Sequence, residues 1–432
     1  GNGTLVAWAD HGIFGFRRGL TVIADEGRVA EFDASGFARW TSDVAYQIAK
    51  NGSNILVQTR KLERPTKVYK ISQTEYLVVD TGGDRVVRID RSAGEIRTIE
   101  RILLDGTYRP SGWTEGDPLP LRQPRDVTMW IDVMRPGTYN LSSPPITQNE
   151  LWVHYLIADT GNRRIIELVD RYFIDANFRV TGVVRDVQGA PQLGVLIWHT
   201  PSSFSGKTWQ FTTIQRILIG VDANGNNKFV YVAGVGDMMP SRVDLGLDPP
   251  DPVAPRETGN LGGLVVFSSS GTEVVNEIVV PGFYAGTRKI RGVNSVFLRG
   301  IGVDANGDIE FSILFTDSTG VYEIARNASG QWETIWMMPN EVYRVLRGVD
   351  LRAAAATRTM IGDVIITNSW FGQDPNGNPF FGEVTQWRTA IDFSRQDLGF
   401  SNLDIQMEIP PAAVCGSEMI RKAVCFVRSV LR

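Results

Sequence analysis

An internal repeat constrains the fold more than any other feature of this sequence. Its two clearest copies are residues 76–90, YLVVDTGGDRVVRID, and residues 155–170, YLIADTGNRRIIELVD. Each copy reads as a β-rich run, an Asp with a Gly-containing turn, and a second alternating run, which is the pattern of two antiparallel strands. Weaker copies keep this order at 21–33, 229–234 with 262–268, 312–325, and 363–368 with 382–387. A unit repeated six times must bury its apolar faces against its neighbours, so the chain is expected to fold as a repeat architecture.

Further strands precede and follow most copies of the repeat. Leading runs are expected at 65–71, 124–133 and 347–351, and the near-duplicates IGVDANGN and IGVDANGD occupy 219–226 and 301–308. Closing runs are expected at 95–102, 178–184, 273–280 and 331–336. Four antiparallel strands per repeat form a propeller blade. The sequence therefore predicts an all-β, six-bladed β-propeller over residues 1–410, with its surplus length in large loops, followed by a tail over residues 411–432.

The repeat also carries a family resemblance. The progression of a Pro, a hydrophobic strand, a DANG turn, a second hydrophobic strand and ADTGNRRI resembles the NHL-repeat family of propellers, most specifically in the second and third copies. The first, fourth and sixth copies lose the leading Pro, the Asp or the short turn. The resemblance implies a six-bladed disc whose members mostly bind partners, with a few branches that carry out chemistry on a central metal.

The polar residues of the repeat have a structural interpretation. Asp80 and Asp159 can accept N–H bonds in the turn that follows them, where the Gly supplies a positive φ. The DANG turns begin like a Ca²⁺ loop, but the twelfth position, which a bidentate Glu would occupy, holds Ala233 in one turn and Phe315 in the other. We therefore expect no metal or other cofactor, with Ca²⁺ left open as the exception.

Three arginines, Arg125, Arg299 and Arg347, fall at one register when the leading strands are aligned, just before a hydrophobic run. One interpretation is a ring of guanidinium groups at the mouth of the central channel that binds a carboxylate or another anion through bidentate bonds. The other is that each Arg pairs with an acid or a carbonyl group of a neighbouring blade and fastens the disc.

The residues offer little for catalysis. There is no GxSxG motif, and the only histidines are His11, His154 and His199, so a hydrolase triad is disfavoured. Three histidines can hold a catalytic Zn²⁺, but His11 and His199 occupy unlike positions in their repeats. A Ca²⁺ site of the gluconolactonase type would need carboxylate and amide side chains along the axis, for which the conceivable ligands are Asp126, Asn294 and Asp350. We regard an enzyme as the less favoured interpretation.

The C-terminal tail differs from the repeats. Residues 417–432 predict a basic amphipathic helix, which packs on its own propeller or docks on a partner through Met419, Phe426 and Val430. The only cysteines, Cys415 and Cys425, suit one disulfide in an exported protein or two free thiols in a cytosolic one. A bridge within the chain would require the segment before the helix to fold back. A bridge between chains is the alternative.

Composition and loop pattern suggest the kind of partner. A net charge of −4 argues against nucleic acid, and no window approaches 18 consecutive apolar residues. Long segments at 104–123, 186–213, 235–261 and 371–381 would share one face of the disc, which is the expected site face. We expect an exported, non-catalytic scaffold that binds proteins, including copies of itself in an oligomer or filament. The alternatives are a metal-dependent lyase or lactonase with a central Ca²⁺ or Zn²⁺, and a lectin that uses exposed tryptophans such as Trp113 and Trp370.

Overall fold

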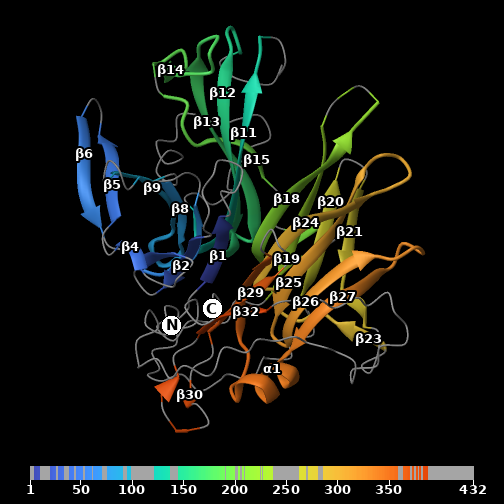
Figure 1. Cartoon of the computed structure of the whole chain (residues 1–432). Helices are drawn as coiled ribbons and strands as arrows, with labels where there is room; N and C mark the ends of the chain where they lie inside the picture. The colour runs from blue at the N-terminus through green and yellow to red at the C-terminus, as the bar shows by residue number, and fades with distance from the viewer. Residues whose placement is uncertain are drawn as a thin grey trace. The chain divides into compact units, whose positions relative to one another are not determined.

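The computed structural model forms two compact units, one of residues 1–42 with 215–432 and the other of residues 43–214 (Figure 1). Each unit is considered separately. The residues that the structure describes are 4–9, 20–25, 28–33, 38–42, 45–51, 54–60, 62–70, 75–90, 95–98, 121–136, 145–189, 191–199, 203–204, 207–208, 210–223, 225, 227–236, 262–268, 271–280, 286–358, 363–369, 372–373, 376–377, 379–380 and 383–387.

The unit of residues 43–214 contains the second and third sheets of the chain. The second sheet has the strand order β6-β5-β10-β9-β8-β7. Its strands are β5 (Ala45–Asn51), β6 (Asn54–Arg60), β7 (Pro65–Lys70), β8 (Glu75–Asp80), β9 (Arg85–Asp90) and β10 (Glu95–Thr98). Strands β7 to β10 form the antiparallel blade, and the hairpin β5–β6 extends it because β5 pairs with β10 in parallel.

The third sheet is built from unusually long strands. It comprises β11 (Pro124–Met134), β12 (Glu150–Asp159), β13 (Arg164–Ile174), β14 (Val180–Val183) and β15 (Val195–His199). Strand β15 pairs with the first half of β13 and β14 with its second half, so the outer position of this sheet is divided between two short strands. Apolar residues of β11, β12 and β13 pack with Leu77 and Val79 of β8 in one buried cluster. A short hairpin, β16 (Ser203–Phe204) with β17 (Lys207–Thr208), follows.

The other unit contains the first, fifth and sixth sheets and most of the fourth. The first sheet is β1 (Thr4–Ala9), β2 (Leu20–Asp25), β3 (Arg28–Asp33) and β4 (Ala38–Ser42), and the fourth is β18 (Phe211–Val221), β19 (Asn227–Val235), β20 (Gly263–Ser268) and β21 (Gly271–Val275). Strand β18 crosses the boundary between the units. The fifth sheet is β24 (Ser295–Val303), β25 (Ile309–Asp317), β26 (Gly320–Arg326) and β27 (Trp332–Pro339), extended by the hairpin of β22 (Glu277–Val280) and β23 (Gly286–Lys289). The sixth is β28 (Ala353–Arg358), β29 (Val364–Asn368) and β32 (Glu383–Trp387), with the small hairpin β30 (Gly372–Gln373) and β31 (Pro379–Phe380) nearby in sequence.

These sheets confirm the predicted all-β propeller. Among the described residues, five sheets contain a four-stranded antiparallel meander and the sixth has three strands. The prediction of a strand at 347–351 is wrong, because residues 340–347 form the helix α1 (Asn340–Arg347) and the strand begins at Ala353. Part of the surplus length lies in strands of nine to eleven residues, such as β11 and β24, rather than in loops. No helix in the described part of the chain is long and apolar enough to cross a membrane.

The Asp of each DTG turn holds the start of its own blade. Asp80 ends β8, and its Oδ1 accepts the main-chain N–H groups of Glu63 and Arg64 at 2.9 and 2.8 Å, just before β7. Asp159 ends β12 and accepts the N–H of Arg122 at 2.7 Å, just before β11. Both residues are therefore structural, as interpreted. Their main-chain donors precede the first strand of the blade rather than follow the Asp.

The Thr of the same turn fastens one sheet to the next. Thr81 donates its hydroxyl to the carbonyl oxygen of Pro124 at the start of β11, at 2.6 Å. Thr160 does the same to Phe211 at the start of β18, also at 2.6 Å. The repeated turn therefore serves both the closure of its blade and the contact with the following blade.

Candidate functional site

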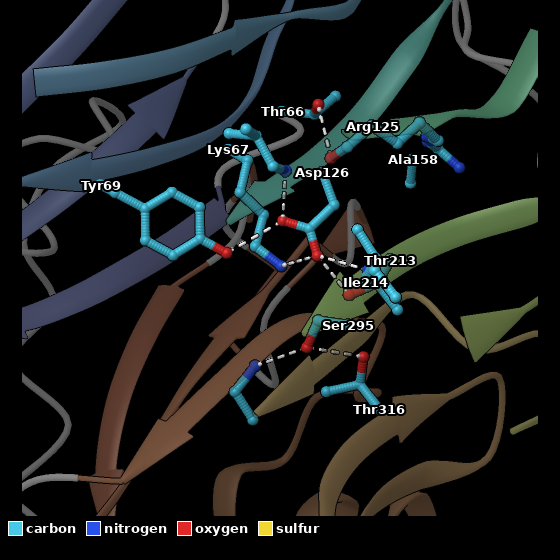
Figure 2. A network of polar contacts seen from close by, with 12 residues as sticks. Thr66, Lys67, Tyr69, Arg125, Asp126, Ala158, Thr213, Ile214, Ser295 and Thr316 are labelled. Atoms are coloured by element: carbon cyan, nitrogen blue, oxygen red, sulfur yellow. Dashed lines mark hydrogen bonds and ion pairs between the residues drawn. The ribbon is translucent and has the colours of Figure 1, made fainter. Parts of the chain in front are cut away.

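The described part of unit 43–214 contains a buried carboxylate on an innermost strand. Asp126 lies on β11 with no exposed surface, and its Oδ1 accepts the hydroxyl hydrogen of Tyr69 at 2.9 Å. The ammonium of Lys67, itself nearly buried, lies 3.3 Å from Oδ2. Both partners come from β7, so these two contacts join the innermost strands of the second and third sheets (Figure 2).

The same carboxylate also contacts the start of the fourth sheet. Oδ2 of Asp126 accepts the main-chain N–H of Ile214 at 3.0 Å and the hydroxyl hydrogen of Thr213, both on β18. The N–H of Val127 donates to Oδ1 at 2.8 Å. Figure 2 shows these donors converging on one carboxylate. Asp126 thus connects three consecutive inner strands, and its oxygens are committed to the fold.

A serine holds the corresponding place in the fifth sheet. Ser295 pairs with Thr316 across β24 and β25, as Asp126 pairs with Ala158 across β11 and β12. Its hydroxyl oxygen accepts the N–H of Ala356 on β28 at 3.1 Å, which links the fifth and sixth sheets. The inner strands are therefore joined by short polar side chains in both units.

The three conceivable Ca²⁺ ligands are each engaged by protein groups. Asp126 has the five donors described above. The side-chain amide of Asn294 donates a hydrogen bond to the carbonyl oxygen of Ala353 at 3.1 Å, and the carboxylate of Asp350 accepts one from the guanidinium of Arg344. Within the described ranges, no three His, Cys, Asp or Glu side chains are grouped so as to hold a metal ion.

The three arginines do not share one strand register. Arg125 is the second residue of β11 and Arg299 the fifth of β24, whereas Arg347 is the last residue of helix α1. The expectation of a common register is wrong. Arg347 lies on a helix where a strand was predicted, and Arg299 lies four residues beyond Ser295, whereas Arg125 directly precedes Asp126. Arg299 and Arg358 both bind the buried carboxylate of Glu323, with nitrogen–oxygen distances of 3.2 and 2.6 Å.

Arg347 belongs to a buried ion pair. Its Nη2 lies 2.6 Å from Oε2 of Glu383, whose Oε1 accepts the hydroxyl hydrogen of Tyr343 at 2.5 Å. Burial, together with the negative charge of Glu383, raises the pKa of Tyr343. Burial lowers the pKa of the Arg347 guanidinium, but the adjacent carboxylate outweighs it and the net pKa is raised. This pair matches the fastening interpretation, and anion binding by the three arginines stays a prediction.

An aromatic and acidic cluster surrounds His154 on β12. The imidazole stacks on Trp130 of β11 with ring centroids 4.8 Å apart and lies 5.9 Å from the ring of Trp152. Its Nδ1 is 2.7 Å from Oε1 of Glu167 on β13, and its Nε2 is 3.4 Å from Oδ2 of Asp132 on β11. The indole N–H of Trp130 donates to the same Oδ2 at 3.0 Å.

Hydrogen bonds and a buried ion pair hold Trp152 of this cluster in place. Trp152 donates its indole N–H to Oε2 of Glu150 at 2.7 Å, and Arg171 binds both oxygens of that carboxylate at 2.9 and 3.0 Å. Sequence reasoning singled out His154 but missed its neighbours, because they come from three strands. The alternation along β12, which places Glu150, Trp152 and His154 on one face, was the available signal.

A strained turn connects β13 to β14. Asp175 accepts the N–H groups of Asn177 and Arg179 through Oδ1, at 2.8 and 2.9 Å, and its carbonyl accepts the N–H of Phe178 at 3.0 Å. Phe178 has φ +61° and its side chain is 65% exposed. The sequence DANF repeats the two DANG turns, in which the fourth residue, Gly225 or Gly307, has φ +80° or +86°.

Several predicted site residues lie outside the described residues. These are His11, Trp113, Trp370, Cys415, Cys425, Met419, Phe426 and Val430, together with most of the long segments at 104–123 and 235–261 and part of that at 371–381. His199 lies on β15, but its side chain is also outside the described set. The disulfide and the partner-binding tail therefore stay predictions.

Comparison with known proteins identifies no family. No protein-family model and no curated protein matches this chain. Among solved structures it is similar to a streptogramin B lyase, with 10% identity over 87% of this chain and 80% of the other at a TM-score of 0.32. It is similar to the N-terminal domain of Nup159, with 9% identity over 81% and 83% at 0.33, and to Kuenenia stuttgartiensis hydrazine synthase, with 10% identity over 86% and 93% at 0.31. At these TM-scores the three structures carry no argument about what this chain does.

Proposed function

We propose that this protein is a non-catalytic interaction scaffold that binds a protein partner through the outer rim of its third sheet. The observation that carries the proposal is Phe178, an exposed aromatic side chain in a left-handed backbone conformation. The proposal extends to an exported location and to self-association as an assembly subunit.

The left-handed conformation is unfavourable for phenylalanine. An L-residue there is less stable by about 1–2 kcal/mol than in the right-handed region, whereas glycine has no such penalty. Two turns of the same sequence type, each beginning with Asp-Ala-Asn, have glycine at this position. Phe178 is 65% exposed, so most of its surface is available to a partner. Strained backbone and exposed aromatic side chains are features of recognition sites.

The neighbouring residues suit a protein partner. Val180 and Val187 are also exposed, at 54% and 88%. Strand β14 is the last in the order β11-β12-β13-β14, so among the described strands its outer edge has no partner. Exposed apolar side chains beside a strand edge can bind an extended segment that supplies both apolar contacts and main-chain hydrogen bonds.

The test compares the full chain with its Phe178→Gly variant. A photo-crosslinking phenylalanine analogue placed at position 187, in chains with Phe or Gly at position 178, identifies bound proteins from an extract of the source organism, and sedimentation velocity of the purified chain detects self-association. We expect a discrete crosslinked partner or self-associated species that the Phe178→Gly variant loses. A matched control, Val303→Ser, removes an exposed valine from β24 and should keep the interaction.

Two results together would overturn the proposal. In the first, wild type and Phe178→Gly capture the same proteins. In the second, both chains are monodisperse monomers at every concentration. Circular dichroism of each variant separates loss of binding from loss of fold.

A further inference from the structure

We infer that His154 and Asp132 form a binding site for a divalent transition-metal ion on the face of the third sheet. The inference is independent of the scaffold proposal, because the site uses different residues and a different kind of ligand. It starts from Nε2 of His154, a buried nitrogen with no hydrogen-bond partner.

The orientation of the imidazole is fixed by its surroundings. The His154 side chain is 9% exposed, stacks on the indole ring of Trp130 and lies 5.9 Å from that of Trp152. Its Nδ1 lies 2.7 Å from a carboxylate oxygen of Glu167. A carboxylate accepts a hydrogen there, so in the neutral imidazole the proton occupies Nδ1 and the lone pair is on Nε2, 3.4 Å from Oδ2 of Asp132.

This arrangement is the one found around metal-binding histidines. Such a histidine almost always donates its other ring N–H to a carboxylate, a main-chain carbonyl or a water, which fixes the tautomer and makes the ligating nitrogen more basic. Glu167 supplies that carboxylate for His154.

The distance to the second acid also fits. Oδ2 of Asp132 lies 3.4 Å from Nε2 of His154. Two ligands at about 2.0–2.2 Å from one tetrahedral ion are about 3.4 Å apart. The indole N–H of Trp130 holds the same oxygen at 3.0 Å, which orients the carboxylate.

The chemistry of the donors selects the metal. One imidazole nitrogen and one carboxylate oxygen suit Zn²⁺, Cu²⁺ or Ni²⁺, whereas Ca²⁺ takes six to eight oxygen ligands. The Asp132 side chain is 41% exposed, so the remaining coordination positions are open to water or to a group from a partner. With two protein ligands the site is an exchangeable one rather than a closed structural centre.

The test measures Zn²⁺ binding to the full chain carrying Cys415→Ser and Cys425→Ser, so that the tail thiols do not compete. Isothermal titration is run for this background and for His154→Gln, Asp132→Asn and Glu167→Gln within it. We expect one ion per chain, at least tenfold weaker binding for His154→Gln and Asp132→Asn, and roughly tenfold to hundredfold weaker binding for Glu167→Gln. His199→Gln, on β15 of the same sheet, is the matched control and should bind as the background does.

A second readout uses the adjacent indoles. Cu²⁺ should quench the part of the tryptophan fluorescence that comes from Trp130 and Trp152, and His154→Gln should lose that quenching. Absence of saturable binding, or unchanged binding in both His154→Gln and Asp132→Asn, would show that His154 is only a structural residue held by two acids. Because Asp132 is the most exposed member, Asp132→Asn keeps the test decisive if His154→Gln does not fold.

Discussion

Phe178 offers a sharp test because glycine should be more stable than alanine at this position, which is the reverse of the usual order. At an ordinary position Gly is less stable than Ala by roughly 0.5–1 kcal/mol, because it loses more backbone entropy on folding. At φ +61° Ala keeps the strain of a left-handed L-residue, about 1–2 kcal/mol, and Gly does not. We therefore expect Phe178→Gly to be more stable than Phe178→Ala by about 1 kcal/mol.

The absolute changes follow from burial. About a third of the side chain is covered, or roughly 70 Å² of a phenylalanine's 150–250 Å², which corresponds to about 1.7 kcal/mol at 25 cal/mol/Å². Both variants lose that contribution, so Phe178→Ala should lose about 2 kcal/mol of unfolding free energy and Phe178→Gly about 1 kcal/mol. If the Phe178 side chain were fully exposed, the two variants would not share this loss of burial.

Urea unfolding followed by circular dichroism measures these differences. Ala176, in the same turn but without a positive φ, provides the control, since Ala176→Gly should show the ordinary sign and lose about 0.5–1 kcal/mol. If Phe178→Ala is as stable as Phe178→Gly, the backbone at this position is not strained. Phe178 would then be an ordinary turn residue that gives no support to partner binding at this site.

Three further predictions concern buried charges. Arg347→Met should destabilise the chain by about 3–5 kcal/mol, because the buried carboxylate of Glu383 is left unpaired. Arg344→Met, on the same helix but 58% exposed, should change stability by less than about 0.5 kcal/mol, and similar losses for the two variants in chemical unfolding would contradict the fastening role of Arg347. Burial raises the pKa of Asp170, so protonation of this carboxyl favours the folded state and its contribution to stability is lost as the pH rises above about 4. The difference in unfolding free energy between wild type and Asp170→Asn should therefore shrink as the pH rises above about 4, and parallel pH profiles for the two proteins would show that the pKa of Asp170 is not raised. Asp126→Ala should cost about 3–5 kcal/mol because Lys67 is left as a buried, unpaired charge, and a loss below about 1 kcal/mol in the same assay would show that the carboxylate does not hold the inner strands together.

The repeat made the fold predictable because each blade repeats a local pattern of alternation and turns. The hairpin at 155–170 is observed as β12 and β13, and the run at 124–133 as β11. The failure at 347–351 is equally local. The stretch from Asn340 to Arg347 has Glu341 in its first turn, Arg344 and Arg347 in its last turn and Gly348 after it, a pattern typical of a helix. The strand predicted from residue 347 overlooked this pattern.

The site was less predictable because its contacts join residues from different strands. Asp80 was interpreted as structural on the basis of its turn, yet its main-chain partners lie sixteen and seventeen residues earlier in the chain. His154 meets Asp132 and Glu167 only when three strands pair in a particular register. The Phe178 turn was detectable in principle, since DANF and DANG differ at one position, but only the backbone angle distinguishes a strained residue from an ordinary strand residue.

The threonine contacts between neighbouring sheets have an evolutionary consequence. Thr81 and Thr160 donate to main-chain carbonyl oxygens, a group that every amino acid possesses, rather than to side chains. The receiving strand therefore needs no matching residue to be held in place. A blade can therefore be duplicated, exchanged or mutated along its first strand while its hydrogen bond to the preceding blade persists.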